Sequence, residues 1–185
     1  MSMIGVSNLH IAVMTTEETA TAAAVYGTPV AIPGTIQIDV NPNSVTGTLY
    51  ADNGAYEAAQ SGLGDGKITI NTADLDLATQ ALIFGHTVTK GVLTKLTSDK
   101  APYVALRFEF EKASGATRFV SVPKVKFAES DESVKTKDNS ITFQTAKCEG
   151  KIVQRKNDKM WYKCADNDAE GYEATTGSTW YTAFD

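Results

Sequence analysis

Basic residues are almost missing from the first half of this 185-residue chain. Residues 1–89 contain eight acids and one base, Lys67, whereas residues 90–163 contain sixteen bases and nine acids. Residues 164–185 contain five acids and no base. The net charge of −5 disfavours tight binding of DNA, which needs a basic surface. The bases of residues 90–163, the basic middle of the chain, either lie on a solvated strand face or form a surface that meets an acidic surface of a neighbouring copy.

Histidine and cysteine are also scarce, with two of each. No His-Glu-x-x-His or Cys-x-x-Cys motif is present, so a zinc site is disfavoured. No local motif pairs a nucleophile with a base, and we predict that the chain is not an enzyme and uses no cofactor. A hairpin turning at Asn157-Asp158 would offset Cys148 from Cys164 by about 10 Å, too far for a disulfide. We therefore expect two free thiols.

Long apolar runs are missing as well. No stretch approaches the roughly 20 apolar residues that cross a bilayer. Residues 1–16 contain no Lys or Arg, and Ser7, Asn8 and His10 interrupt their apolar pattern, unlike a signal peptide. We expect synthesis in the cytosol and no insertion into a membrane.

The residues that are present alternate mostly with the period of β-strands. Every second residue from Val104 to Phe110 is apolar, and a turn at 113–115 leads into a second strand at 117–127. The apolar phase changes at Pro123, which predicts a β-bulge. Further strands are predicted at 36–40 and 67–70, and a last hairpin at 141–154 and 160–164.

One segment has helical spacing instead. Leu75, Ala78 and Leu82 repeat at helical intervals, so we predict a helix at about residues 74–84. Asp74 would be its N-cap, and Gly85 would end it in a left-handed conformation. The predicted fold is therefore mainly β with one α-helix. We assign residues 1–165 to a single domain and residues 166–185 to an acidic, aromatic C-terminal segment.

Residues 41–66 are rich in Gly, Asn, Ser and Ala and contain no base. We predict a long, partly disordered loop with a short strand at 48–50, because loops of this length are functional or disordered. Such a loop would become ordered against a neighbouring copy. The side chains able to make this contact are Leu49, Tyr50, Asp52, Tyr56, Glu57, Leu63 and Asp65.

The C-terminal segment offers two further interpretations. Residues 166–171 match the first half of a calcium loop, but Gly177 replaces the glutamate needed at position twelve and no helical pattern flanks the match. A solvated acidic tail is the better interpretation. Trp180, Tyr181 and Phe184 need a surface to cover them, either on the chain's own sheet or on a neighbouring copy.

Several short motifs resemble a known family when their order and spacing are taken together. They are Val25-Tyr26-Gly27-Thr28-Pro29, Asn41-Pro42-Asn43-Ser44, Leu49-Tyr50-Ala51-Asp52-Asn53-Gly54, Ala73-Asp74-Leu75, Gly85-His86-Thr87, Ala101-Pro102-Tyr103-Val104-Ala105-Leu106-Arg107-Phe108, Lys135-Thr136-Lys137 and Ile141-Thr142-Phe143-Gln144-Thr145. The series covers nearly the whole chain and resembles the phi-thirteen-type major tail proteins, the tail tube proteins of long-tailed, non-contractile phages.

This resemblance implies a β-sandwich-like or barrel-like tail tube fold with one flanking helix. It also implies hexameric rings whose inner strands join into one β-barrel, and rings that stack into the virion's tail tube. The tube would be assembled in the host cytoplasm with a tape measure protein, a tail terminator and a distal tail protein. DNA would pass through it without specific binding, along a wall to which Asp39 is a candidate contributor.

No catalytic residue comes with the resemblance. The 21 residues after Cys164 are too few for the additional immunoglobulin-like domain of about 100 residues that some tail tube proteins have. Two alternatives stay open. One is the tube protein of a contractile injection or secretion system, and the other is a monomeric ligand-binding β-sandwich.

Overall fold

The computed structural model describes residues 2–130, 136, 145–182 and 184. Its strands are β1 (Met3–Thr16), β2 (Val25–Tyr26), β3 (Val30–Ala31), β4 (Thr35–Asn41), β5 (Thr46–Ala51), β6 (Gly54–Gln60), β7 (Lys67–Thr72), β8 (Thr87–Thr89), β9 (Val92–Thr94), β10 (Tyr103–Lys112), β11 (Thr117–Phe127), β12 (Ala146–Ile152) and β13 (Lys163–Asp166). Its helices are α1 (Leu77–Phe84) and α2 (Ala174–Thr179). The prediction of a mainly β fold is confirmed, but the second helix was not predicted.

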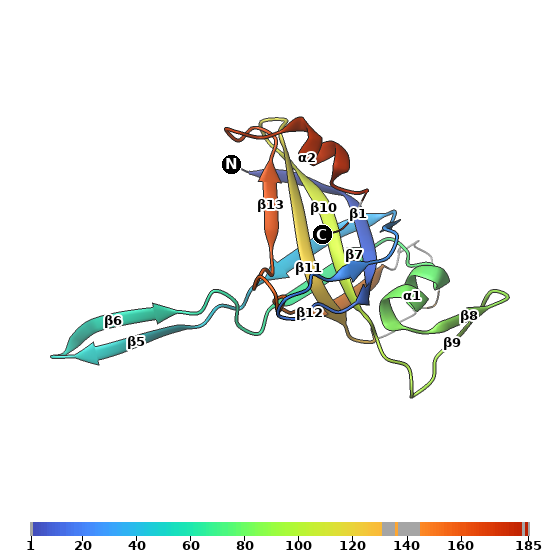
Figure 1. Cartoon of the computed structure of the whole chain (residues 1–185), viewed down its shortest axis with the longest axis horizontal. Coiled ribbons are helices and arrows are strands. Elements are labelled where there is room, and N and C mark those ends of the chain that lie inside the picture. Colours follow the sequence, from blue (N-terminus) through green and yellow to red (C-terminus); the bar gives the residue numbers. More distant parts are fainter. Residues whose placement is uncertain (1, 131–135, 137–144, 183, 185) are drawn as a thin grey trace.

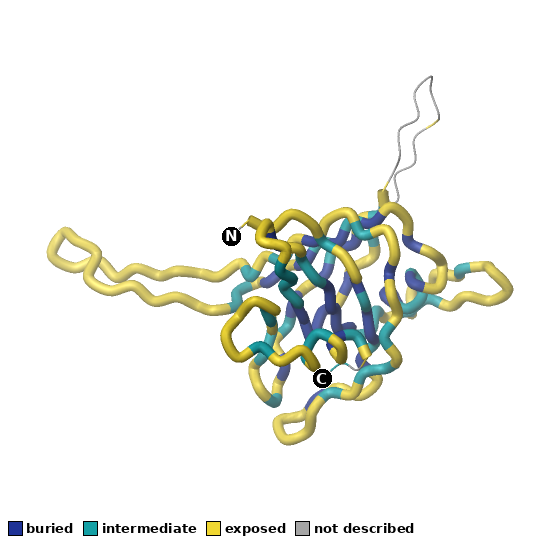
Figure 2. Tube along the Cα trace, turned by 90° about the horizontal axis from the view of Figure 1, so that it is seen from above, coloured by how far each residue is buried: buried dark blue, intermediate teal, exposed yellow. Residues whose placement is uncertain are grey.

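Nine strands form one antiparallel sheet in the order β2-β1-β10-β11-β12-β7-β4, with β13 paired to β11 and β3 paired to β1 (Figure 1). Although β1 and β4 are far apart in this order, they contact each other. Leu9 and Ile11 of β1 and Ile38 of β4 belong to the same buried cluster. The sheet therefore curls around one core, which Figure 2 shows as buried strands in the body of the molecule.

The predicted hairpin of β10 and β11 lies at the centre of the sheet. Val104 pairs with Val125 and Leu106 pairs with Val122, so β11 has one more residue than β10 over this stretch. This confirms the bulge predicted near Pro123. The extra residue keeps Val122 and Val125 both fully buried, which a regular strand would not allow for residues three apart.

The bulge also buries a charged side chain, Lys124. Its Nζ lies 2.7 Å from Glu18 Oε1 and 2.9 Å from Glu17 Oε1, and it stands 4.4 Å from the centre of the Tyr103 ring. Burial opposes ionisation of Lys124, but the two carboxylates keep its pKa above the ordinary value. This ion-pair network joins the segment after β1 to the middle of β11.

Helix α1 begins later than predicted. Asp76 is the N-cap, and its Oδ1 accepts a hydrogen bond of 2.9 Å from the Thr79 N–H. Asp74, the predicted cap, instead accepts a bond from the Leu75 N–H. Gly85 ends the helix at a φ of 77°, as predicted.

The predicted last hairpin is wrong. β12 pairs with β7 and with the end of β11, whereas β13 pairs with the first half of β11. Both thiols are free as expected, but the reason given for it, a register between these two strands, does not hold. Residues 141–144, where this hairpin was to begin, lie outside the described residues.

Candidate assembly surfaces

Residues 46–60 form an antiparallel hairpin, β5–β6, which we name the arm. It projects far from the body of the molecule (Figure 1), and every one of its strand residues is exposed. Asp52 and Asn53 form its turn with φ angles of 50° and 63°, the backbone of a type I′ hairpin turn. The prediction of a partly disordered loop is therefore corrected to a two-stranded hairpin.

Three of the predicted contact residues are large apolar side chains on the arm. Leu49 is 58% exposed, Tyr50 72% and Tyr56 73%. Leu49 lies opposite Glu57, so an apolar and an acidic side chain share one face. Large exposed apolar groups gathered on one element mark an interaction surface.

Two other predicted contact residues belong to the body and not to the arm. Leu63 is half-buried and packs against the core. Asp65 forms an exposed ion pair of 2.8 Å with Lys151 of β12. The predicted loop of residues 41–66 therefore extended too far toward β7, because its last part belongs to the body of the molecule.

Asp39 lies on the exposed face of β4, beside β7 and β12. Gln37 donates hydrogen bonds of 3.0 and 2.9 Å to its two carboxylate oxygens. The bases of this face are balanced by acids, because Glu149 pairs with Lys67 and Lys147. These pairs lower the pKa of Glu149 to about 2, with Lys147 as the first cause. The face around Asp39 is thus close to neutral and not acidic.

The C-terminal segment packs on the chain's own sheet. Trp180 is 4% exposed, and its Nε1 donates a hydrogen bond of 3.4 Å to the Val120 carbonyl. The Arg107 guanidinium lies 5.0 Å from the Trp180 ring centre and 4.6 Å from that of Phe184, and it donates to the Trp180 carbonyl. Tyr181 donates to Glu109, and its ring packs at a tilt against that of His10, with 4.5 Å between the ring centres. Of the two alternatives, the structure shows docking within one chain.

The acids of the same segment are occupied by bases. Arg118 donates two hydrogen bonds to Asp166, at 2.6 and 2.7 Å, and these hold the pKa of Asp166 far below its ordinary value. Lys112 pairs with Asp166 at 2.8 Å and with Asp168 at 2.5 Å. Two of the would-be calcium ligands are therefore ion-paired, which explains the acidic sequence without a metal.

No family model and no curated protein matches this chain. Among the described residues, no group of three or more His, Cys, Asp and Glu side chains is placed to hold a metal ion. In the same residues, no helix combines the length and the apolar character needed to cross a membrane.

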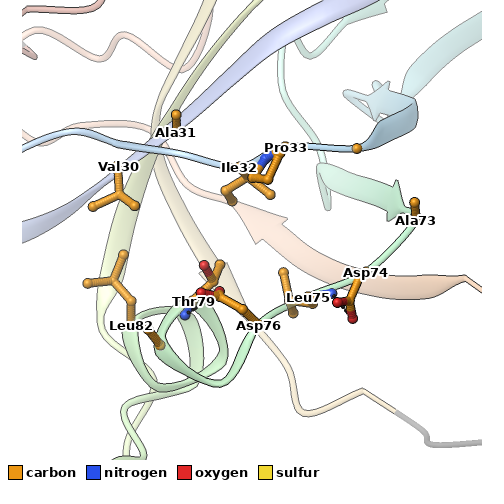
Figure 3. Close-up of a pocket in the computed structure, with 12 residues that line it drawn as sticks. Val30, Ala31, Ile32, Pro33, Ala73, Asp74, Leu75, Asp76, Thr79 and Leu82 are labelled. Atoms are coloured by element: carbon orange, nitrogen blue, oxygen red, sulfur yellow. Dashed lines mark hydrogen bonds between the residues drawn. The ribbon is translucent and has the colours of Figure 1, made fainter.

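A groove of about 400 Å³ lies between α1 and the segment from β3 to β4. Figure 3 shows Val30 and Ile32 on the strand side, with Leu75 and Leu82 on the helix side. Asp74 and Asp76 are exposed and give the helix side an acidic rim. The groove was not predicted from the sequence, because its two sides are about 40 residues apart in the chain.

A second exposed hairpin, β8–β9, projects next to α1 at the opposite end of the molecule from the arm (Figure 1). We name it the short hairpin. Val88 is 37% exposed and Val92 62%, and Lys90 is in its turn with a φ of 52°. It presents apolar side chains and a base, whereas the arm presents apolar side chains and acids.

An ion-pair cluster fixes the two ends of the short hairpin where it joins the body of the molecule. His86 Nδ1 lies 2.9 Å from Asp99 Oδ2, and His86 Nε2 lies 2.9 Å from Glu129 Oε2. The protonated ring can donate to both carboxylates, and hydrogen bonding to Asp99 and then to Glu129 raises the pKa of His86. Lys95 pairs with Glu129 at 2.6 Å. Glu129 thus holds the residues on either side of the short hairpin.

Proposed function

We propose that this chain is a virion structural protein that self-assembles into stacked hexameric rings, forming the tail tube through which a long-tailed phage delivers its genome. The single observation that supports this most is the arm, a hairpin with both faces exposed in one copy. An isolated two-stranded hairpin is marginally stable in water, so the arm needs a second surface. In the proposed tube, that surface belongs to the next ring.

The sandwich-like fold and the ring-wide barrel are part of this proposal. The outer edge of β4 supports them, because among the described strands β4 pairs only with β7, and an unpaired strand edge is a template for pairing with another chain. The exposed face around Asp39 would line the channel. A near-neutral wall suits passing DNA. Ordered Lys or Arg side chains without an acidic partner would bind the DNA phosphates, because that binding releases counterions.

The proposed tube is a homo-oligomer assembled in the host cytoplasm. Within the virion it would meet the tape measure protein inside and the terminator and distal tail proteins at its ends. No catalytic step is needed for these roles.

The first test is to remove the arm alone. Ser61 N donates to the Val45 carbonyl at 2.9 Å, so an Asn-Gly turn can join Val45 to Ser61 in place of residues 46–60. The variant should fold normally, since every arm residue is exposed and Leu63 stays in place. It should form no tubes by negative-stain microscopy at concentrations at which the unaltered chain does.

A matched variant keeps the arm's length but changes Tyr50→Ser and Tyr56→Ser. It should also lose tube growth, because the two most exposed aromatic side chains are gone. If both variants formed tubes at the concentration at which the unaltered chain does, the arm would not be the element that stacks the rings. An unaltered chain that stays monomeric at every concentration would reject the tube and leave the ligand-binding alternative.

A further inference from the structure

The groove beside α1 is an apolar surface that the described residues leave open. Val30 on its strand side is 39% exposed, and Leu82 on its helix side is half-buried. Leu77, on the outer side of α1, is 40% exposed. An apolar depression with a charged rim is the form of a docking site, and the chemistry of the rim selects the occupant.

The rim of the groove favours a basic partner. Asp74 and Asp76 line it, and no basic side chain among the described residues does. The arm is a poor occupant because it has Asp52 in its turn and Glu57 on β6, and like charges that face each other across an interface oppose binding. The short hairpin is a good occupant, since Val92, which shares a face with Thr89, is exposed next to the turn that contains Lys90.

We propose that the short hairpin of one copy docks into the α1 groove of a second copy, with Val92 against Val30 and Leu82 and with Lys90 toward Asp74 and Asp76. This inference rests on the proposed function in one respect, that copies of the chain associate. It deepens that function by naming a contact separate from the arm. The arm at the opposite end of the molecule then stays available for a different neighbour.

The residues that join the short hairpin to the body hold it in an orientation suited to docking. His86 precedes β8 directly and Lys95 follows β9 directly, and both bind Glu129 after β11. The His86 side chain is only 5% exposed. A hairpin already held in one orientation loses less conformational entropy when it binds than a free loop would.

Cross-linking between two variants that each have one added cysteine tests the contact. Ala78 lines the groove and is exposed, so Ala78→Cys places a thiol at the site, and Val92→Cys places one on the short hairpin. Both variants also contain Cys164→Ser, because Cys164 is exposed. Cys148 can remain, since it is buried and burial raises its pKa to about 11, which keeps the thiol unreactive.

The two variants, with tags of different length, are mixed under mild oxidation. We expect a disulfide heterodimer at least tenfold more abundant than in a control mixture of Ala78→Cys with Thr21→Cys, a cysteine at an exposed site far along the chain. Mixing separate chains excludes a bond within one chain. Equal yields in the two mixtures would overturn the proposed contact.

A second measurement uses sedimentation of the Val92→Asp variant. Val92 is 62% exposed, so the change should leave the fold intact while it places an acid against an acidic rim. We expect association to weaken at least tenfold. Lys90→Glu should weaken association as well. Asp74→Lys should restore part of the association that Lys90→Glu loses, because the two changes together reverse the charges of the pair.

The outcomes separate this contact from the proposed function. Rings that form equally well with Val92→Asp would overturn the contact and leave the tube intact. Association that depends on Val92 but gives only dimers would support the contact and reject the tube. A chain that remains monomeric would overturn both.

Discussion

Single residues explain why the C-terminal segment stays on its own chain. Ala105 and Arg107 lie on the face of β10 opposite to the core, and yet they are 1% and 3% exposed. Trp180 and Phe184 cover Arg107 from outside, and Phe119 packs against both Trp180 and Tyr172. The central strands are therefore buried on both faces. A chain without this cover would expose an arginine and an aromatic face to water.

Replacing Trp180 by alanine should destabilise the fold by about 3–5 kcal/mol, the usual range for a buried large aromatic side chain. The loss combines apolar burial, the Arg107 cation–π contact and the Val120 hydrogen bond. Urea unfolding, followed by far-UV circular dichroism of the backbone, measures the change in the free energy of unfolding.

The matched control is Tyr50→Ala, at an exposed aromatic residue of the arm, which should change the free energy of unfolding by less than about 0.5 kcal/mol. If Trp180→Ala were as mild as this control, the segment would not be anchored by Trp180 within one chain.

Sequence reasoning could not find the partners of the buried charges. Lys124 follows Pro123 in an apolar strand, and nothing local indicates that it is buried. Its partners Glu17 and Glu18 are more than 100 residues away along the chain. Only the bulge, which the apolar phase did predict, explains why Lys124 points where it does.

At the scale of the elements, periodicity predicted those strands in which every second side chain enters the core. β10, β11, β7 and part of β4 show this alternation in sequence and were found, although β10 and β11 are largely buried on both faces. The arm has no buried face, so its strands have no alternation to detect. Its one available signal was Asp52-Asn53-Gly54, a turn sequence typical of hairpins. β12 and β13 were wrongly predicted to pair with each other, because neighbours in sequence were assumed to be neighbours in the sheet.

The short hairpin should loosen as the pH rises. His86 has a pKa raised above 6.5 by Asp99 and then Glu129, and Lys95 is the other charged group at this cluster. A raised pKa means that the stabilisation is complete below the unfolded-state pKa and is lost as the pH passes the folded-state value. Hydrogen exchange of the β8–β9 amides, corrected for the intrinsic effect of pH, should therefore show less protection above neutral pH.

His86→Gln is the matched variant for this test. It removes the titrating group while it keeps hydrogen-bonding capacity, so its corrected protection should not change over the same pH range. Protection in the β5–β6 amides serves as the internal reference, since no part of the arm contacts His86. A pH response that persists in His86→Gln would assign the loosening to another group.

At the scale of the whole molecule, the uneven charge of the sequence is largely balanced within one copy. Lys124 and Lys156 bind Glu17 from the acidic first half, and they lower its pKa to about 2, with Lys124 as the first cause. Lys112 and Arg118 bind Asp166 from the acidic end. The basic middle is thus neither a plain solvated face nor wholly a surface for other copies. Much of it pairs with the two acidic ends of the same chain.

The arm is different, because no ion pair within the described part of the chain involves Asp52 or Glu57. If these two acids meet bases of a neighbouring ring in the proposed tube, each exposed pair contributes about 0.2–1 kcal/mol. The double variant Asp52→Asn, Glu57→Gln should then raise the critical concentration for tube growth by about 2- to 30-fold, since 1.4 kcal/mol is a factor of ten. Turbidity and microscopy over a concentration series measure this value.

Salt should have the same effect on the unaltered chain, because ions at about 0.1 M screen exposed charges beyond about 10 Å. Moving from 50 to 500 mM salt should raise its critical concentration but hardly change that of the arm variant. Glu170→Gln with Glu173→Gln is the control, since it changes the net charge equally at exposed C-terminal positions. If this control lost its salt response as fully as the arm variant, net charge alone would set assembly, and the arm's acids would have no specific partner on the next ring.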